Sequence, residues 1–198
     1  MGRQAEKSET TRAALISAAR ELFAEHGYAA VGTTEIVTRA NSSRGAMYHH
    51  FKDKQELFRA VYEQIQQELM DDVSAHMSHT GDGGPLAAFE AGLRSFLLAC
   101  LQPDKARIGL IDAPAVLGWR QWRELDEQYA LGMVTAGLQL GVDAGVLRTD
   151  VPVRFLAHLV LAALGEAGLL IAGATDPGAA RLEAERALLA LLDGLRTA

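Results

Sequence analysis

The sequence predicts an all-α protein in which an N-terminal three-helix helix-turn-helix unit is joined by a long helix to a helical-bundle body. Three observations lead to this prediction. Apolar residues recur at helical spacing near the N-terminus, short helices and tight turns alternate over residues 33–58, and two very apolar helices close the sequence. Of the 198 residues, 49% are hydrophobic and 22% are charged, which suits a folded chain with a substantial core.

The first helix is predicted from an apolar stripe and a stop signal. Gly27 can adopt the left-handed conformation that ends a helix. The stripe falls at i, i+3, i+4, i+7 and i+8, so one side of this helix should face the core. Its members are Leu15, Ala18, Ala19, Leu22 and Phe23.

The next elements are predicted from capping and turn residues. Thr33 is expected to cap a short helix, Asn41 to form the sharp left-handed turn after it, and Ser43 to cap the following helix. Asp53, with Glu56 three residues later, has the capping-box pattern for a long fourth helix. This order of short helix, turn and short helix is typical of a helix-turn-helix motif.

The third helix has too few apolar residues to be only a core helix. Met47 and Phe51 can face inward, which leaves the other sides of the helix for its polar residues. Arg44 can reach guanine edges or phosphate, and Tyr48 and His49 can donate hydrogen bonds to phosphate oxygens. The pattern favours insertion into the major groove of DNA. An ordinary helical hairpin with a solvated polar face is the alternative.

Charge is divided unevenly along the chain, whose net charge is −6. Residues 1–60 hold nine Lys and Arg against seven Asp and Glu, whereas residues 61–198 hold ten against eighteen. Only the N-terminal part can therefore present a face that attracts phosphate. Lys54, in the first turn of the fourth helix, adds a positive charge where free backbone N–H groups already favour a phosphate.

Residues 8–58 closely resemble the DNA-binding domain of TetR/AcrR-family transcriptional repressors. The resemblance rests on many positions at fixed spacing: Gly27, Tyr28, Thr33, Ile36, Val37, Ala40, Ser43, Arg44, Gly45, Met47, Tyr48, His49, His50, Phe51, Lys52, Asp53, Lys54, Leu57 and Phe58. It implies a helix-turn-helix DNA-binding domain over residues 8–55 and a ligand-binding and dimerisation domain over residues 56–198. The residues it places against DNA are Thr33, Thr34, Ser42, Ser43, Arg44, Gly45, Tyr48, His49 and Lys54.

The body should consist of helices separated by glycine and proline signals. A glycine-rich loop is expected over residues 80–85. Gly145 should end a long helix, and Asp176 with Pro177 should cap and start the last one. The helical segments expected before that last helix are 85–101, 104–110, 114–144 and 152–171.

The last two helices are too apolar to form an exposed pair. Because such helices must be covered on two sides, two from each subunit would make a four-helix dimer interface. Burial in the core of a monomer is the alternative for the same residues. Those predicted to form the interface are Leu156, Leu159, Ala163, Ala167, Leu188, Leu192 and Leu195.

Bulky side chains in the body are candidates for an effector pocket, although core packing and structural pairing would explain them as well. Pro114 and Gly118 precede two indoles and leave room for a helix to shift when a ligand binds. The candidate ligand-binding residues are Phe89, Leu93, Phe96, Trp119, Trp122, Met133, His158 and Glu166.

Other classes of protein find no support in the sequence. No Gly-rich phosphate loop or Ser/His/Asp pattern stands out, so we expect no enzymatic activity, cofactor or metal. The single cysteine, Cys100, rules out an intrachain disulfide and fits a reducing cytoplasm. The apolar stretch 155–174 contains His158 and Glu166 and lacks flanking anchors, so a buried helix is expected there and no membrane span.

These features together predict a cytoplasmic, homodimeric transcriptional repressor. Its two heads would bind a near-palindromic operator in double-stranded DNA, and a small, largely apolar effector in the body would release them. Two alternatives stay open. One is an activator or constitutive DNA binder without a functional effector pocket, and the other is a helical protein-interaction module.

Overall fold

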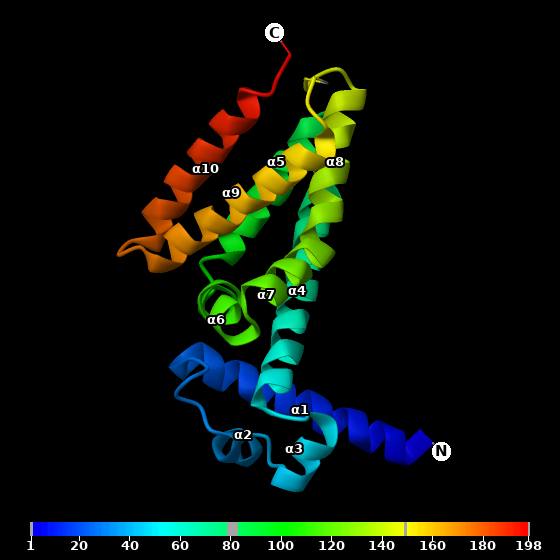
Figure 1. The fold of residues 1–198 in the computed structure, drawn as a ribbon, viewed down its shortest axis with the longest axis vertical. Coiled ribbons are helices and arrows are strands. Elements are labelled where there is room, and N and C mark those ends of the chain that lie inside the picture. The colour runs from blue at the N-terminus through cyan, green and yellow to red at the C-terminus, as the bar shows by residue number, and fades with distance from the viewer. Residues whose placement is uncertain (1, 79–82, 149, 198) are drawn as a thin grey trace.

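The computed structural model describes residues 2–78, 83–148 and 150–197. Every named element in these ranges is a helix, and the helices form a small head at one end and a longer body at the other (Figure 1). Within the same ranges, the one β-type contact is an isolated bridge between Leu147 and Arg196. The predicted all-α fold is confirmed.

The head consists of three helices packed on the start of a fourth. Helix α1 lies across α2 and α3, and α4 rises from the head along the body (Figure 1). Because α4 contacts α1 in the head and α5 in the body, it is shared by both parts. The bounds are α1 Gly2–His26, α2 Thr33–Arg39, α3 Arg44–His50 and α4 Lys54–Ser78.

The turns of the head form as their residues predict. Gly27 has φ 79° and Asn41 has φ 47°, so both adopt the left-handed conformation that lets the chain reverse after a helix. Ser43 caps α3, because its Oγ accepts a hydrogen bond from the backbone N–H of Ala46 at 3.1 Å. The turn between α2 and α3 is thereby fixed at both ends.

The predicted cap of α2 is wrong. Gly32 takes the capping position in extended conformation, and Thr33 is the first helical residue. The Gly32 carbonyl accepts from the N–H groups of Glu35 and Ile36, so the backbone starts this helix without a side-chain cap.

The start of α4 matches its capping-box prediction. Asp53 Oδ1 accepts from the backbone N–H of Glu56 at 2.8 Å, and the Glu56 carboxylate reaches back to the backbone N–H of Lys52. Two donors that the helix would leave unpaired are thus satisfied. The direction in which α4 leaves the head is fixed by these side chains.

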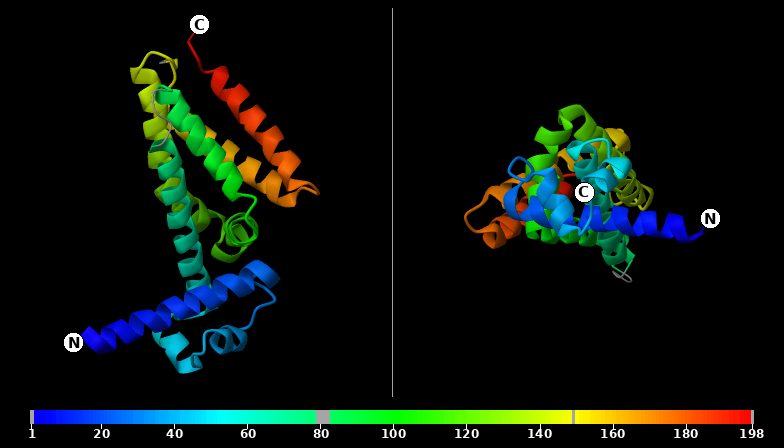
Figure 2. Two further views of the ribbon diagram at one scale, coloured as in Figure 1. Left: turned by 180° about the vertical axis from the view of Figure 1, so that it is seen from behind. Right: turned by 90° about the horizontal axis from the view of Figure 1, so that it is seen from below.

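The body is built from shorter helical segments and two long C-terminal helices. The latter, α9 and α10, pack on each other along one flank of the body (Figure 2). Segments η1 and η2 are π-helices, which are uncommon and occur often at functional sites. The bounds are α5 Pro85–Ala99, η1 Lys105–Asp112, α6 Ala113–Leu117, α7 Trp119–Asp126, η2 Glu127–Leu131, α8 Gly132–Asp143, α9 Val153–Gly173 and α10 Pro177–Asp193.

The single helix predicted over residues 114–144 is wrong. Gly118 has φ 81° and separates α6 from α7, and a π-helical stretch separates α7 from α8. The other body signals hold. Gly145 has φ 71° after α8, and the Asp176 side chain caps α10 by accepting from the Ala179 N–H at 3.0 Å. Of the predicted loop 80–85, residues 80–82 lie outside the described ranges.

One apolar core joins the head to the lower body. The predicted stripe of α1 is buried, with Leu22 and Phe23 fully inaccessible. The same cluster continues into the body through Ile108 of η1 and Trp122 of α7. If these body segments move, they therefore push on side chains of the head that pack directly against them.

Helix α9 is long and apolar enough to cross a membrane by length and composition alone. In the fold it contacts α8, α10 and η1, and residues such as Ala157 and Ile171 are fully buried there. Its remaining face is exposed and mostly apolar, with Glu166 among the exposed residues. Packing within the body accounts for one side of α9 only.

Candidate nucleic-acid interface and body cavity

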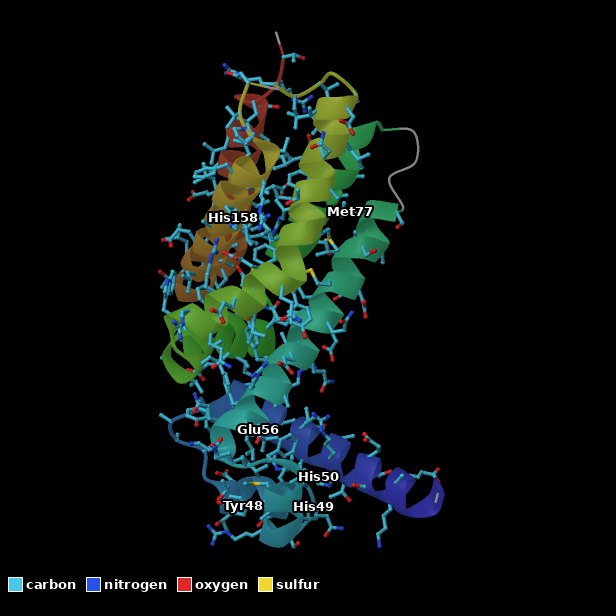
Figure 3. All side chains as sticks on the ribbon, turned by 45° about the vertical axis from the view of Figure 1, so that its right-hand side comes forward. Tyr48, His49, His50, Glu56, Met77 and His158 are labelled. Atoms are coloured by element: carbon cyan, nitrogen blue, oxygen red, sulfur yellow. The ribbon has the colours of Figure 1, made fainter. Side chains whose placement is uncertain are left out.

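The polar face of α3 lies at the end of the molecule farthest from the C-terminus, where Tyr48 and His49 project from the helix (Figure 3). Met47 and Phe51 are buried on the opposite face, with 0% and 2% of their surface exposed. Arg44, Tyr48 and His49 are exposed. The division of the helix between buried apolar and exposed polar residues agrees with the sequence analysis.

Gly45 leaves this face unusually thin. A Cβ built on Gly45 would meet nothing closer than the Ser43 Oγ at 3.9 Å. Packing inside the protein therefore gives no reason for a glycine here, and the backbone of α3 is not in the left-handed region at this position. The bare backbone is instead available for close approach by a partner surface.

The remaining predicted contact residues surround α3. Thr34 is exposed on α2, whereas Thr33 and Ser42 are half-buried. The Ser43 oxygen accepts the capping hydrogen bond, which leaves its O–H free to donate outward. Arg44 has no ion-pair partner within the described ranges. The structure thus gathers the predicted residues at one end of the head.

Lys54 has a structural role that the sequence did not indicate. Its Nζ donates to the backbone carbonyls of Tyr28 and Val31, each at 2.9 Å, and lies 4.0 Å from the centre of the Tyr28 ring. Burial lowers the pKa of Lys54. Two of its three donors are thus used to tie α4 to the turn after α1, and at most one can meet a phosphate.

An ion-pair cluster joins the head to the body. Arg20 of α1 donates to Glu68 of α4 at 2.7 Å and, through Nε and Nη2, to Asp104 at 2.9 and 2.7 Å. The hydrogen bond from Arg20 lowers the pKa of Glu68. Burial raises the pKa of Asp104, but hydrogen bonds from Arg20 and the backbone outweigh it and leave that pKa below its usual value.

A cavity lies in the body above this cluster, between α4, α5, η1, α7, α8 and α9. The centre of a water-sized sphere can move through about 90 Å³ of it. Five of the predicted ligand-binding residues line it: Phe89, Leu93, Phe96, Trp122 and Met133. The structure therefore brings together residues from three helices, α5, α7 and α8, that the sequence could only suggest one by one.

Three predicted ligand-binding residues do not reach the cavity. Trp119 has 68% of its surface exposed and packs its ring on Trp122 from outside. His158 faces the carboxylate of Glu127, with Nδ1 and Oε1 3.5 Å apart. Glu166 is exposed on α9. The break at Gly118 and the rotation of α9 turn these side chains away.

Sequence analysis missed the polar groups that line the cavity. These groups are Gln66 and Lys105, each only 8% exposed, and Asp126. Burial raises the pKa of Asp126 to about 6. Asp126 sits in a run of charged residues that looks like a solvated surface, but in the structure this last residue of α7 lies on the cavity wall. No pattern in the sequence would have singled it out.

The predicted dimer residues divide into two groups. Ala167, Leu188 and Leu192 are 6–7% exposed and belong to the subunit's own core, so their assignment to an interface is corrected. Leu156, Ala163 and Leu195 are partly buried against the same core, and Leu159 is 60% exposed. The exposed apolar residues on α9 and α10 that the prediction omitted are Phe155, Leu169, Leu170, Leu182 and Leu191.

Two parts of the sequence match known protein families. Residues 15–61 match bacterial regulatory proteins of the tetR family, and residues 86–195 match the tetracyclin repressor-like C-terminal domain. The first match covers most of the head and the second covers more than half of the chain. Both halves of the fold therefore find counterparts in one family.

Two known proteins have sequences similar to that of this chain. The chain is 32% identical to the transposon Tn10 TetC protein of Escherichia coli over 67% of its own length and 66%, just under two thirds, of TetC. It is 30% identical to the HTH-type transcriptional repressor AcnR of Corynebacterium glutamicum, over 87% of this chain and 88% of AcnR.

Among solved structures, a TetR-family transcriptional regulator from Pectobacterium atrosepticum is 32% identical to this chain. The superposition has a TM-score of 0.85 and covers 100% of this chain and 99% of the other. The likeness thus extends over head and body together.

Proposed function

The chain belongs to the TetR family of DNA-binding transcriptional regulators, whose members are not enzymes, and we propose that it acts as a homodimeric, effector-released repressor in the cytoplasm. In this proposal two heads bind a near-palindromic operator. A small molecule in the body cavity then favours a dimer whose heads no longer fit that operator.

The observation that carries the proposal is the exposed face of α3. Arg44 is exposed and free of ion pairs within the described ranges, and Gly45 beside it offers bare backbone. A guanidinium can contact guanine edges bidentately, and a helix without side-chain bulk can come close to the groove floor. Tyr48 and His49 then lie where they can donate to phosphate oxygens.

Dimerisation is supported by the exposed apolar side of α9 and α10. Phe155, Leu159 and Leu170 are each at least 60% exposed and lie along one face of α9, and α10 carries two further exposed leucines, Leu182 and Leu191. Contiguous apolar surface of this kind is costly in water and marks an interaction site. A second copy of the same two helices would cover it with four-helix packing.

Effector release is supported by the position of η1. Lys105 of η1 lines the cavity, and Asp104 immediately before it holds Arg20 of the head. Asp112 at the other end of η1 accepts from the backbone N–H of Tyr28 at 2.9 Å. A ligand that displaces η1 therefore acts directly on the C-terminal part of α1, through Arg20, and on the turn after it, through Tyr28.

Binding to DNA tests the proposal. Fluorescence anisotropy of the full chain should show tight binding to a duplex from its own upstream region and weak binding to a scrambled duplex. Affinity should fall steeply as salt rises, because phosphate contacts release counterions. Equal, weak binding to both duplexes by protein shown by mass spectrometry to carry no bound molecule would contradict a repressor of its own upstream region.

A further inference from the structure

We propose that the body cavity takes a small apolar molecule whose polar end is a hydrogen-bond donor, either an ammonium or a hydroxyl group. Asp126 would accept from this donor, and the Gln66 amide would contact it from the side. The inference rests on the proposed effector role of the cavity and adds the chemistry of the effector. It excludes molecules whose polar end is a carboxylate.

The size of the cavity limits the ligand. The centre of a water-sized sphere can reach about 90 Å³ of the cavity, so the cavity has room for several waters or a small organic molecule. One ring with a short side chain fits this limit, whereas a long-chain lipid does not.

The walls of the cavity are suited to an apolar body. Phe89 and Phe96 of α5, Met70 of α4 and Met133 of α8 all line the space. Aromatic rings offer flat contact surfaces, and methionine side chains adapt to irregular shapes. Gly165 on α9 adds a stretch of wall without a side chain, and a Cβ there would meet nothing within 4 Å.

Asp126 is the acceptor at the polar end. Its Oδ2 is 3.4 Å from Arg123 Nη1, a long contact, and Arg123 also donates to Glu127 at 3.1 Å. The guanidinium of Arg123 is therefore shared between the carboxylates of Asp126 and Glu127. His158 Nδ1 lies 3.5 Å from the Glu127 carboxylate. Asp126 keeps 21% of its side-chain surface exposed, and a partly buried carboxylate with one long contact can accept a hydrogen bond from a further donor.

Gln66 supplies a second polar contact. Its Nε2 donates to the hydroxyl oxygen of Tyr62, and no described residue pairs with its Oε1. The side chain is only 8% exposed and lines the cavity. The Gln66 amide oxygen can accept a hydrogen bond from a ligand donor in the cavity.

A carboxylate ligand would find no free cation. Lys105 is the one basic residue that lines the cavity within the described ranges, and its Nζ already donates to Asp72 at 3.0 Å. Asp72 offsets the charge of Lys105, and an anion in the cavity would also face the charge of Asp126. The cavity therefore discriminates by charge as well as by size.

Binding of four probes of similar size tests the inference: phenethylamine, phenethyl alcohol, propylbenzene and phenylacetate. Calorimetry on the full chain should rank the amine and the alcohol above the hydrocarbon, and the carboxylate last. Asp126→Asn should weaken the amine by about 10-fold or more, because a charge-assisted hydrogen bond becomes a neutral one. Glu124→Gln, on the same helix but 70% exposed, is the matched control and should change nothing.

The results separate this inference from the proposed function. Phenylacetate binding as tightly as phenethylamine, or amine binding unchanged in Asp126→Asn, overturns the inference. If none of the four probes binds, the inference is overturned, and the proposed effector role of the cavity is overturned with it. If the amine binds through Asp126 but leaves the operator complex intact, the ligand class stands and effector release fails.

Discussion

Arg20 of the head and Asp104 of η1 are joined by two hydrogen bonds, from Nη2 at 2.7 Å and from Nε at 2.9 Å. The residue after Asp104, Lys105, lines the body cavity. A single π-helical segment is thus in contact with both the cavity and α1. This arrangement gives a ligand-induced shift of η1 a short physical route to the head.

The Arg20 cluster should stabilise the fold in a pH-dependent manner. Arg20→Met should lower the free energy of unfolding by about 1–2 kcal/mol near neutral pH, because two half-buried carboxylates lose their cation. The folded-state pKa values of Glu68 and Asp104 lie below their usual values, so the stabilisation is present above those usual values and is lost as the pH falls through the lowered ones.

Urea unfolding of wild type and Arg20→Met across acid pH measures this difference. Arg39→Met, which breaks an exposed pair with Glu21, is the control and should cost less than about 0.5 kcal/mol. A difference between wild type and Arg20→Met that stays constant down to strongly acid pH would contradict the account.

Gly45→Ala should separate stability from DNA affinity. The added methyl group meets open space in the free protein, and alanine favours a helix, so stability should be unchanged or rise by about 0.5 kcal/mol. Operator affinity should fall by about 10-fold, because the methyl group holds α3 away from the groove. Thermal unfolding and anisotropy on the same samples check both effects. Loss of stability would mean that Gly45 is required by the fold itself.

Leu159→Glu should produce monomers. Leu159 is 60% exposed in the middle of the apolar face of α9, and a carboxylate there would be buried without a partner in the dimer. Sedimentation velocity should show the mass halved, with the helical circular dichroism retained. Leu140→Glu places the same charge on α8, where Leu140 is 55% exposed, and should leave the dimer intact. An unchanged mass in Leu159→Glu would place the interface elsewhere.

Ionisation of Asp126 should lower the free energy of unfolding as the pH rises. Its folded-state pKa of about 6 lies above the usual 3.8, so the folded protein is more stable below the usual pKa and loses this stability as the pH rises through about 6. Asp126→Asn lacks this titration. The variant should match wild type near about pH 4 and exceed it by on the order of 1–3 kcal/mol near about pH 8. Urea unfolding at both pH values would show the opposite order if the carboxylate instead stabilises the fold.

Much of the head could be predicted because its signals are local. The left-handed Asn41, the capping Ser43 and the stripe of α1 each act within a few residues, and each appears in the structure as expected. The predicted cap at Thr33 is wrong because the Gly32 carbonyl starts the helix without any side chain. Local chemistry thus determined most of the DNA-binding head.

The body could be predicted less well because its site depends on contacts between distant segments. Gly118 was recognised as a place where a helix could move, but its positive φ breaks the helix outright and leaves Trp119 outside the cavity. Asp126 ends α7 just before a π-helical segment, and it lines the cavity because several distant segments meet there. Helical periodicity, which assumes a constant rotation per residue, could not reveal this.

The central claim is that α3 reads DNA sequence, and the Arg44→Ala variant tests it most directly. Anisotropy should show its affinity for the operator reduced by about 10- to 100-fold, as expected for loss of a bidentate base contact, with little change on a scrambled duplex. Arg120→Ala, which removes an arginine 93% exposed on α7, should bind both duplexes like wild type. Unchanged operator affinity in Arg44→Ala would contradict the assignment of α3 as the reading helix.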